Sequence, residues 1–248
     1  ELSTARQPDH PQVRSWDDFP IKEHLGAAFG VRTLLDQDVY LMAQAEQRFG
    51  WTDARVLLCV KVGTVISCGV VVDGRVVRGA QSMAGEIGHT RVSGRDVPCW
   101  CGNAGCLDAV AGGGALASAL TARGLPCSSA RDVSRLAVAG VPEAVQLVRA
   151  AGRDIGEVLS GAINLLNPGV IVFWGYLAEA EEPLFAGLHE TIYQRSLPSV
   201  TRKLTLARTR LGDDTGTIGA AMMVIDEVLS EAAIDGTSFR PGAEAAST

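Results

Sequence analysis

The sequence predicts an α/β fold, because segments with a helical spacing of apolar residues alternate with short apolar runs of strand length. Asp73 and Gly74 lie between two such runs and indicate a hairpin, since both residue types tolerate positive φ. The chain has 248 residues, of which 47% are hydrophobic, so it is long enough for one large domain or two small ones.

Composition excludes several classes of protein. The net charge of −6 argues against this chain wrapping nucleic acid by itself. The most apolar stretch, residues 161–178, is interrupted by Asn164, Asn167 and Pro168, so we expect no transmembrane helix. The N-terminus has neither Met nor the apolar core of a secretory signal. We therefore expect a cytoplasmic protein that has been trimmed, processed or cut from a longer polypeptide.

In the first half of the chain, glycine residues mark the ends of the predicted helices. Gly30 suits a left-handed helix C-cap, and Gly50 ends a second helical run. The expected elements are, in order, a polar loop (residues 1–20), a helix (21–29), a short strand (31–38), a helix (39–49), a strand (54–62), a hairpin (67–72 with 75–78) and a loop rich in Gly and Cys (84–106).

The second half is mostly helical. Ser128, Ser129 and Asp132 offer side chains that can cap a helix start, and Asn167-Pro168 stops a long helix. The tail, residues 231–248, has no periodicity, so we expect it to be disordered. The expected elements are helices over 107–120, 133–139, 143–166, 182–195 and 217–229, with strands over 170–174 and 203–207.

Three of the six cysteines lie within eight residues of one another, at Cys99, Cys101 and Cys106, and His89 precedes them. Without a secretory signal, such a cluster is more often a metal site than a disulfide framework. One imidazole and three thiolates form the four-ligand set that holds structural Zn²⁺ with no position left for water. The alternative is a glycine-rich surface loop with reduced thiols.

The motif GEIGH at residues 85–89, followed by CWCGNAGC at 99–106, resembles the signature of the ROK family (repressor, open reading frame, kinase). The resemblance extends over residues 16–228. It includes LDQDV at 35–39, NLLNPGVIVF at 164–173 and LGDDTGTIGAA at 211–221. It implies an actin-like ATPase fold (ribonuclease H-like), here without part of the N-terminal lobe, and assigns zinc to His89 and the three cysteines.

The resemblance also implies a sugar site. Asp38 matches the carboxylate that faces a sugar hydroxyl and acts as general base in the family's kinases. Glu86 and His89 match sugar-contacting positions, and Gln37 stands beside the base where the family has Asn. Asp108 stands where the family has Glu. Taken without the motif, each carboxylate reads as a solvated surface charge. We expect the acidic residues and His89 to converge on one cleft.

Other positions depart from the kinase pattern. Family kinases carry a Gly-Thr-Gly-x-Gly phosphate loop, whose glycines let backbone N–H groups approach ATP. Here residues 63–67 are Gly-Thr-Val-Ile-Ser, so Val65 and Ser67 place side chains at that position. Trp174 replaces a glycine on the purine side, and Tyr40 replaces an Asn two residues after Asp38. These substitutions indicate that ATP binding is lost.

Three functions are compatible with these observations. The first is the effector-binding and oligomerising part of a ROK repressor, which binds a sugar or sugar phosphate. It would form a homo-oligomer and reach DNA only through a helix-turn-helix upstream of Glu1. The alternatives are a truncated or divergent ATP-dependent sugar kinase that uses Asp38, and a zinc-stabilised scaffold that binds no sugar. The expected organisation is an N-terminal loop or remnant of the first lobe (1–20), a sugar-kinase-like domain (21–230) with a zinc loop at 84–108, and a tail (231–248).

Overall fold

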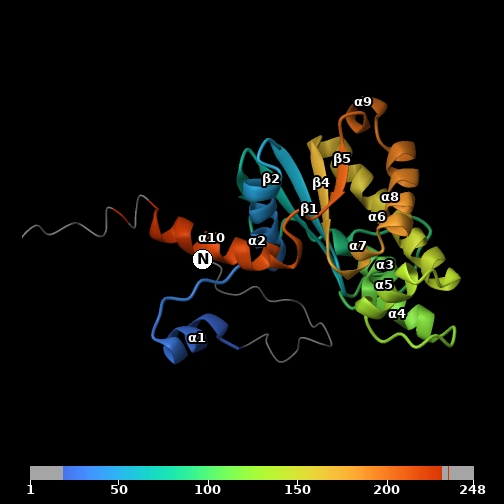
Figure 1. The fold of residues 1–248 in the computed structure, drawn as a ribbon, viewed down its shortest axis with the longest axis horizontal. Coiled ribbons are helices and arrows are strands. Elements are labelled where there is room, and N and C mark those ends of the chain that lie inside the picture. The colour runs from blue at the N-terminus through green and yellow to red at the C-terminus, as the bar shows by residue number, and fades with distance from the viewer. Residues whose placement is uncertain (1–18, 231–233, 235–248) are drawn as a thin grey trace, which may run out of the picture.

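A computed structural model describes residues 19–230 and residue 234 (Figure 1). The expectations for most of residues 1–20 and for the tail lie outside this part of the chain. A five-stranded mixed sheet of order β3-β2-β1-β4-β5 forms its centre. Its strands are β1 (Val56–Val62), β2 (Ile66–Val72), β3 (Arg75–Val77), β4 (Val170–Trp174) and β5 (Thr205–Arg208).

The sheet joins an antiparallel hairpin to parallel strands. β1 pairs antiparallel with β2 from Val56 opposite Val72 to Val62 opposite Ile66. It pairs in parallel with β4, which pairs in parallel with β5. The predicted β2–β3 turn is confirmed, because Asp73 has φ 48° and Gly74 has φ 78°.

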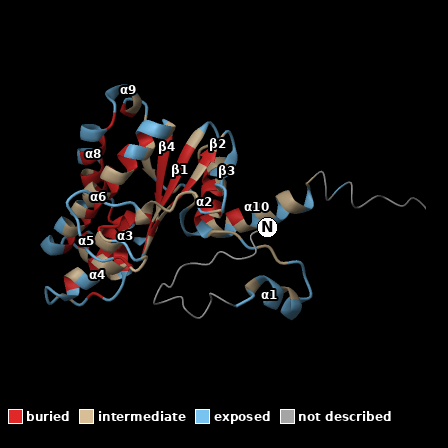
Figure 2. Cartoon of the chain, turned by 180° about the vertical axis from the view of Figure 1, so that it is seen from behind, coloured by how far each residue is buried: buried red, intermediate tan, exposed pale blue. Residues whose placement is uncertain are grey.

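Successive residues of β1 face opposite sides of the sheet, and each side has its own core (Figure 2). Leu58, Val60 and Val62 contribute to the larger core, which lies between the sheet and the helices on that side. Leu57 and Cys59 face the smaller core, which includes Met42 and Ala43. The helices on the larger core are α3 (Leu107–Ala111), α4 (Gly113–Thr121), α5 (Ala130–Val138), α6 (Pro142–Leu166), α7 (Tyr176–Glu179), α8 (Glu181–Arg195) and α9 (Pro198–Thr201).

The smaller core is covered by α2 (Asp38–Ala45), which continues into a π-helical turn (Glu46–Gly50), and α10 (Thr215–Val228) packs on α2. α2 crosses the sheet at Gly69, where an added Cβ would lie 2.4 Å from the carbonyl oxygen of Val39. α10 crosses α2 in the same way at Gly219. These close approaches fix the N-terminus of α2 beside the end of β1.

Two predictions are wrong. Residues 31–37 form no strand, and no strand of the described chain pairs with them; Val31 is 60% exposed. The helix expected over 107–120 is interrupted at Gly112, which is extended at ψ 146°. The interruption lets the next helix start against the β1–β2 turn, because the N–H of Gly113 donates to the Gly63 carbonyl at 2.9 Å.

α1 (Ile21–Phe29) ends at Gly30 with φ 64°, as predicted, but buries no residue and lies apart from the sheet (Figure 1). Among the described helices, none is both long and apolar enough to cross a bilayer.

Candidate functional site

The four predicted metal ligands lie together. The ligand atoms of His89, Cys99, Cys101 and Cys106 are all within 4.8 Å of one another. The Cys99 Sγ is 3.7 Å from His89 Nδ1, and the Cys101 Sγ is 3.7 Å from the Cys106 Sγ. In a tetrahedral site with zinc–sulfur bonds of about 2.3 Å, neighbouring sulfurs are about 3.8 Å apart. The donor set and its spacing therefore fit a tetrahedral metal ion.

Backbone geometry brings these ligands together across the loop. Gly105 has φ 74°, and a Cβ there would lie 2.4 Å from the Arg95 carbonyl oxygen. The Cys99 N–H donates to the Asn103 carbonyl at 2.7 Å, which closes a tight turn around Cys101. Burial raises the pKa of the Cys106 thiol to about 12, so this cysteine holds its proton in the absence of a cation.

A second polar cluster lies at the N-terminus of α2. The Gln37 amide donates to the Ser82 carbonyl at 2.8 Å, which ties this end of the helix to the chain that leads into Glu86. Burial and the nearby charge of Asp38 raise the pKa of Glu86, while the charge of His89 opposes the rise. Gln37, Asp38, Glu86 and His89 therefore share one region, although their role in sugar binding remains a prediction.

Lys61 is a component of this cluster that the sequence analysis missed. It lies on the same face of β1 as Leu57 and Cys59, and its Nζ pairs with the Asp38 Oδ2 at 2.5 Å. A Cβ added at Gly63 would lie 3.7 Å from the Lys61 Cε, so the lysine stem passes over the β1–β2 turn. The sequence did contain a signal for this residue, because Lys61 is the single charged residue in the apolar run 56–62.

The start of α2 also rests on a buried ion pair. The Asp36 side chain is 1% exposed and accepts from the Arg78 guanidinium at 2.6 Å. That guanidinium lies 5.3 Å from the centre of the Tyr40 ring, and the Tyr40 hydroxyl donates to the Ala84 carbonyl at 2.8 Å. The buried Tyr40 side chain thus links α2 to the segment before Glu86 through this hydrogen bond.

Asp108 has a different environment. Its Oδ1 accepts from the Ile66 N–H at 2.6 Å, at the start of β2. It lines a cavity of about 210 Å³ together with Thr64, Val65 and Trp100, and neither Asp38 nor Glu86 lines that cavity. Asp108 also approaches the segment that carries Glu86 and His89, because a Cβ added at Gly88 would lie 2.7 Å from its Oδ1. The expected convergence of the acidic residues and His89 on one cleft stays a prediction.

Residues 63–67 and 174–176, here termed the nucleotide-side segments, include the β1–β2 turn and the end of β4. Trp174 packs against the smaller core, and its indole N–H donates to the Gly212 carbonyl at 3.0 Å. Gly175 has φ 111°, and a Cβ there would lie 2.8 Å from the Val62 carbonyl oxygen. The indole thus bridges β4 to the turn that precedes α10.

The helix-flanked mixed sheet is the actin-like ATPase fold found in sugar kinases. A solved ROK glucokinase from Streptomyces griseus superposes with a TM-score of 0.73 at 23% identity, over 84% of this chain and 73% of that one. The ROK family pattern matches residues 5–227. The chain belongs to the ROK family.

Relatives include both regulators and kinases. The transcriptional dual regulator NagC of Escherichia coli is 30% identical over 87% of this chain and 54% of its own length. The glucokinase of Halalkalibacterium halodurans is 30% identical over 84% of this chain and 68% of its own length. A solved ROK regulator described as a homologue of E. coli Mlc gives a TM-score of 0.74 at 28% identity, over 82% of this chain and 54% of that one. The chain spans about half the length of these regulators.

Proposed function

We propose that this chain is the effector-binding part of a sugar-responsive ROK repressor, with a structural zinc ion and a nucleotide site that no longer works. The observation that carries the proposal is the Trp174 bridge to Gly212, which places a packed indole at the end of β4. A purine approaching β4 would meet the indole.

The proposed zinc ion is held by His89, Cys99, Cys101 and Cys106. When bound, it supplies a cross-link and a fixed charge rather than a reactive centre, since four protein ligands fill a tetrahedral site. Trp100 lies edge-on to the His89 ring, with centroids 4.7 Å apart, and so restricts the orientation of the imidazole. The cross-link would hold residues 84–108 against α3, and with them Glu86.

In this proposal Gln37, Asp38, Glu86 and His89 contact the hydroxyl groups of the effector, and Asp108 contacts it through a water or indirectly. Carboxylates and carboxamides accept and donate the paired hydrogen bonds that sugar hydroxyls offer. DNA contact and self-association belong to the whole protein: a separate helix-turn-helix would read the operator, and the domain at residues 21–230 would form a homo-oligomer.

The test is a thermal-unfolding screen against aldohexoses, pentoses, their phosphates and Mg²⁺–ATP. A ligand that binds only the native state raises the melting temperature, so a sugar or sugar phosphate should stabilise the chain and ATP should not. Stabilisation by ATP alone would contradict the proposal. If no sugar and no nucleotide stabilises the chain, the zinc-stabilised scaffold is favoured instead.

A second candidate is a sugar kinase. It is favoured by Asp38, which stands at the position of the family's general base, and by the 30% identity to the glucokinase of H. halodurans. A coupled assay decides between the two: ATP-dependent turnover that Asp38→Asn abolishes would replace the repressor proposal. We expect no turnover above the level of that variant.

A further inference from the structure

A cavity of about 280 Å³ lies outside the site described above, between α2, the β2–β3 hairpin and α10. It is here termed the arginine cavity. Three guanidinium groups, two carboxamides and one carboxylate line it, from Arg48, Arg75, Arg78, Gln44, Gln47 and Asp226. Neither Asp38 nor the cysteine loop contributes to it.

The one carboxylate in the arginine cavity, Asp226, already accepts three hydrogen bonds. Asp226 accepts from Arg48 at 2.8 and 2.9 Å through its two oxygens and from the Gln44 amide at 2.9 Å. Its charge is therefore neutralised, and its effect is to hold the Arg48 guanidinium and the Gln44 side chain in fixed orientations. A ligand in the cavity would meet groups that are ordered in advance.

The balance of charge leaves one cation without a partner. Arg78 is paired with Asp36 and Arg48 with Asp226, whereas Arg75 makes no ion pair with any residue between 19 and 230. Three arginines thus face one cavity and share two carboxylates. Guanidinium groups bind planar and tetrahedral oxyanions through paired hydrogen bonds, better than they bind chloride or water.

We propose that the arginine cavity binds a small, multiply charged oxyanion of the size of a phosphate monoester. Arg75 would supply the unpaired charge, and Arg48 and Arg78 would donate through the guanidinium nitrogens that their carboxylate partners leave available. Gln47, which bears no charge, would add an amide donor. The proposal is independent of the sugar site, because it uses none of the residues assigned to that site.

The test is calorimetric titration of the whole chain with inorganic phosphate, with ionic strength held constant by sodium chloride. We expect saturable binding at one site per chain. Arg75→Gln should weaken it by about tenfold or more, because it removes the uncompensated charge. Arg75 has no ion pair to lose, so this variant should keep the melting temperature of the unmodified protein, which is measured in parallel.

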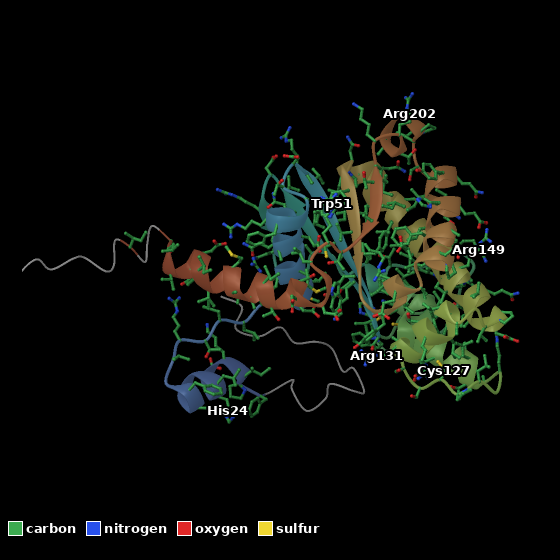
Figure 3. All side chains as sticks on the ribbon, in the orientation of Figure 1. His24, Trp51, Cys127, Arg131, Arg149 and Arg202 are labelled. Carbon is green, nitrogen blue, oxygen red and sulfur yellow. The ribbon has the colours of Figure 1, made fainter. Side chains whose placement is uncertain are left out.

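Two further variants keep the test decisive. Gln47→Glu adds a carboxylate to the cavity without changing its size and should also weaken phosphate binding by about tenfold. Arg202→Gln is the matched control: Arg202 is an exposed arginine beside α9, far from α2 and α10 (Figure 3), and the variant should bind within about twofold of the unmodified protein. Absence of saturable binding, or equal weakening by Arg75→Gln and Arg202→Gln, would overturn the proposal.

Discussion

The cysteine loop (residues 84–108) and the nucleotide-side segments both adjoin the β1–β2 turn, yet different interactions hold them. Every residue from Ser93 to Pro98 in the loop is exposed, and this stretch is held by backbone hydrogen bonds, by the ion pair of Arg95 with Asp154 and by a hydrogen bond from the Ser93 N–H to Glu157. The flanks of the stretch reach the larger core through residues such as Val92 and Leu107. On the nucleotide side, Trp174 packs against a hydrophobic core and hydrogen-bonds to Gly212. Residues 93–98 thus bury no apolar side chain, whereas Trp174 lies against a core.

This difference indicates where each region's stability originates. A segment with few buried apolar side chains gains little from the hydrophobic effect, so a metal cross-link would dominate its free energy of folding. A segment filled by an indole gains from burial and needs no ligand. One region is therefore expected to respond to chelators, and the other to changes in side-chain volume.

The largest expected effect is on the cysteine loop. Cys106→Ser should abolish stoichiometric metal binding and lower the free energy of unfolding by more than about 3 kcal/mol, because metal binding energy is also folding energy. Elemental analysis and urea unfolding measure the two quantities. The control is Cys127→Ser: Cys127 (labelled in Figure 3) contacts Thr121 of α4 and Ser129 and is not one of the four clustered residues, so that variant should keep its metal. Metal-free protein from a chelator-free purification would contradict the prediction.

The next effect tests the nucleotide side. Trp174→Ala should lower the free energy of unfolding by about 2–3 kcal/mol, since it opens a cavity beside the smaller core. Trp174→Phe keeps most of the packing but loses the hydrogen bond to Gly212, so it should cost about 1 kcal/mol. Metal content should be unchanged in both variants. Equal effects of the two substitutions would show that packing of the indole contributes little.

The same contrast explains what the sequence could predict. The proximity of His89 to Cys99, Cys101 and Cys106 was predictable because metal coordination, which their spacing indicates, restricts the residue types whatever the surrounding fold. The hairpin at Asp73-Gly74 and the helix end at Gly30 were predictable because φ values near +50 to +80° restrict the residue type. These are local requirements, and a single sequence records them.

Features that depend on partners distant in the chain were not predictable. Val31 and its neighbours have the composition of a strand, but no strand among residues 19–230 lies beside them, so they form no ladder with that part of the chain. The ion pair of Lys61 with Asp38 depends on which face of β1 the lysine occupies and on where α2 crosses the sheet at Gly69. Both facts appear only once the fold is assembled.

A smaller effect concerns the residues between the two regions. For a sugar found in the unfolding screen, Asp38→Ala and Glu86→Ala should each weaken binding by more than about 1.5 kcal/mol, as expected for lost hydrogen bonds to charged groups. Asp53→Ala, an exposed acidic residue after the π-helical turn, is the matched control and should leave the affinity unchanged. Unchanged affinity in both site variants, measured by calorimetry, would place the sugar elsewhere.

The smallest expected effect is the pH dependence of stability at Asp132, which takes part in the cap of α5 and lies outside the cysteine loop. Hydrogen bonds from the Ser128 N–H and from the Ser129 and Ser128 hydroxyls lower the pKa of Asp132 from 3.8 to about 2. Because the folded-state pKa is lowered, this carboxylate stabilises the protein above pH 3.8, and the stabilisation is lost as the pH falls through about 2. The stability difference between the unmodified protein and Asp132→Asn should therefore be constant from about pH 5 to 7 and narrower at about pH 3. Protonation of the metal ligands at low pH affects both proteins equally and cancels in that difference, so urea unfolding of the pair isolates the α5 cap. A difference that widens as the pH falls would contradict the assignment.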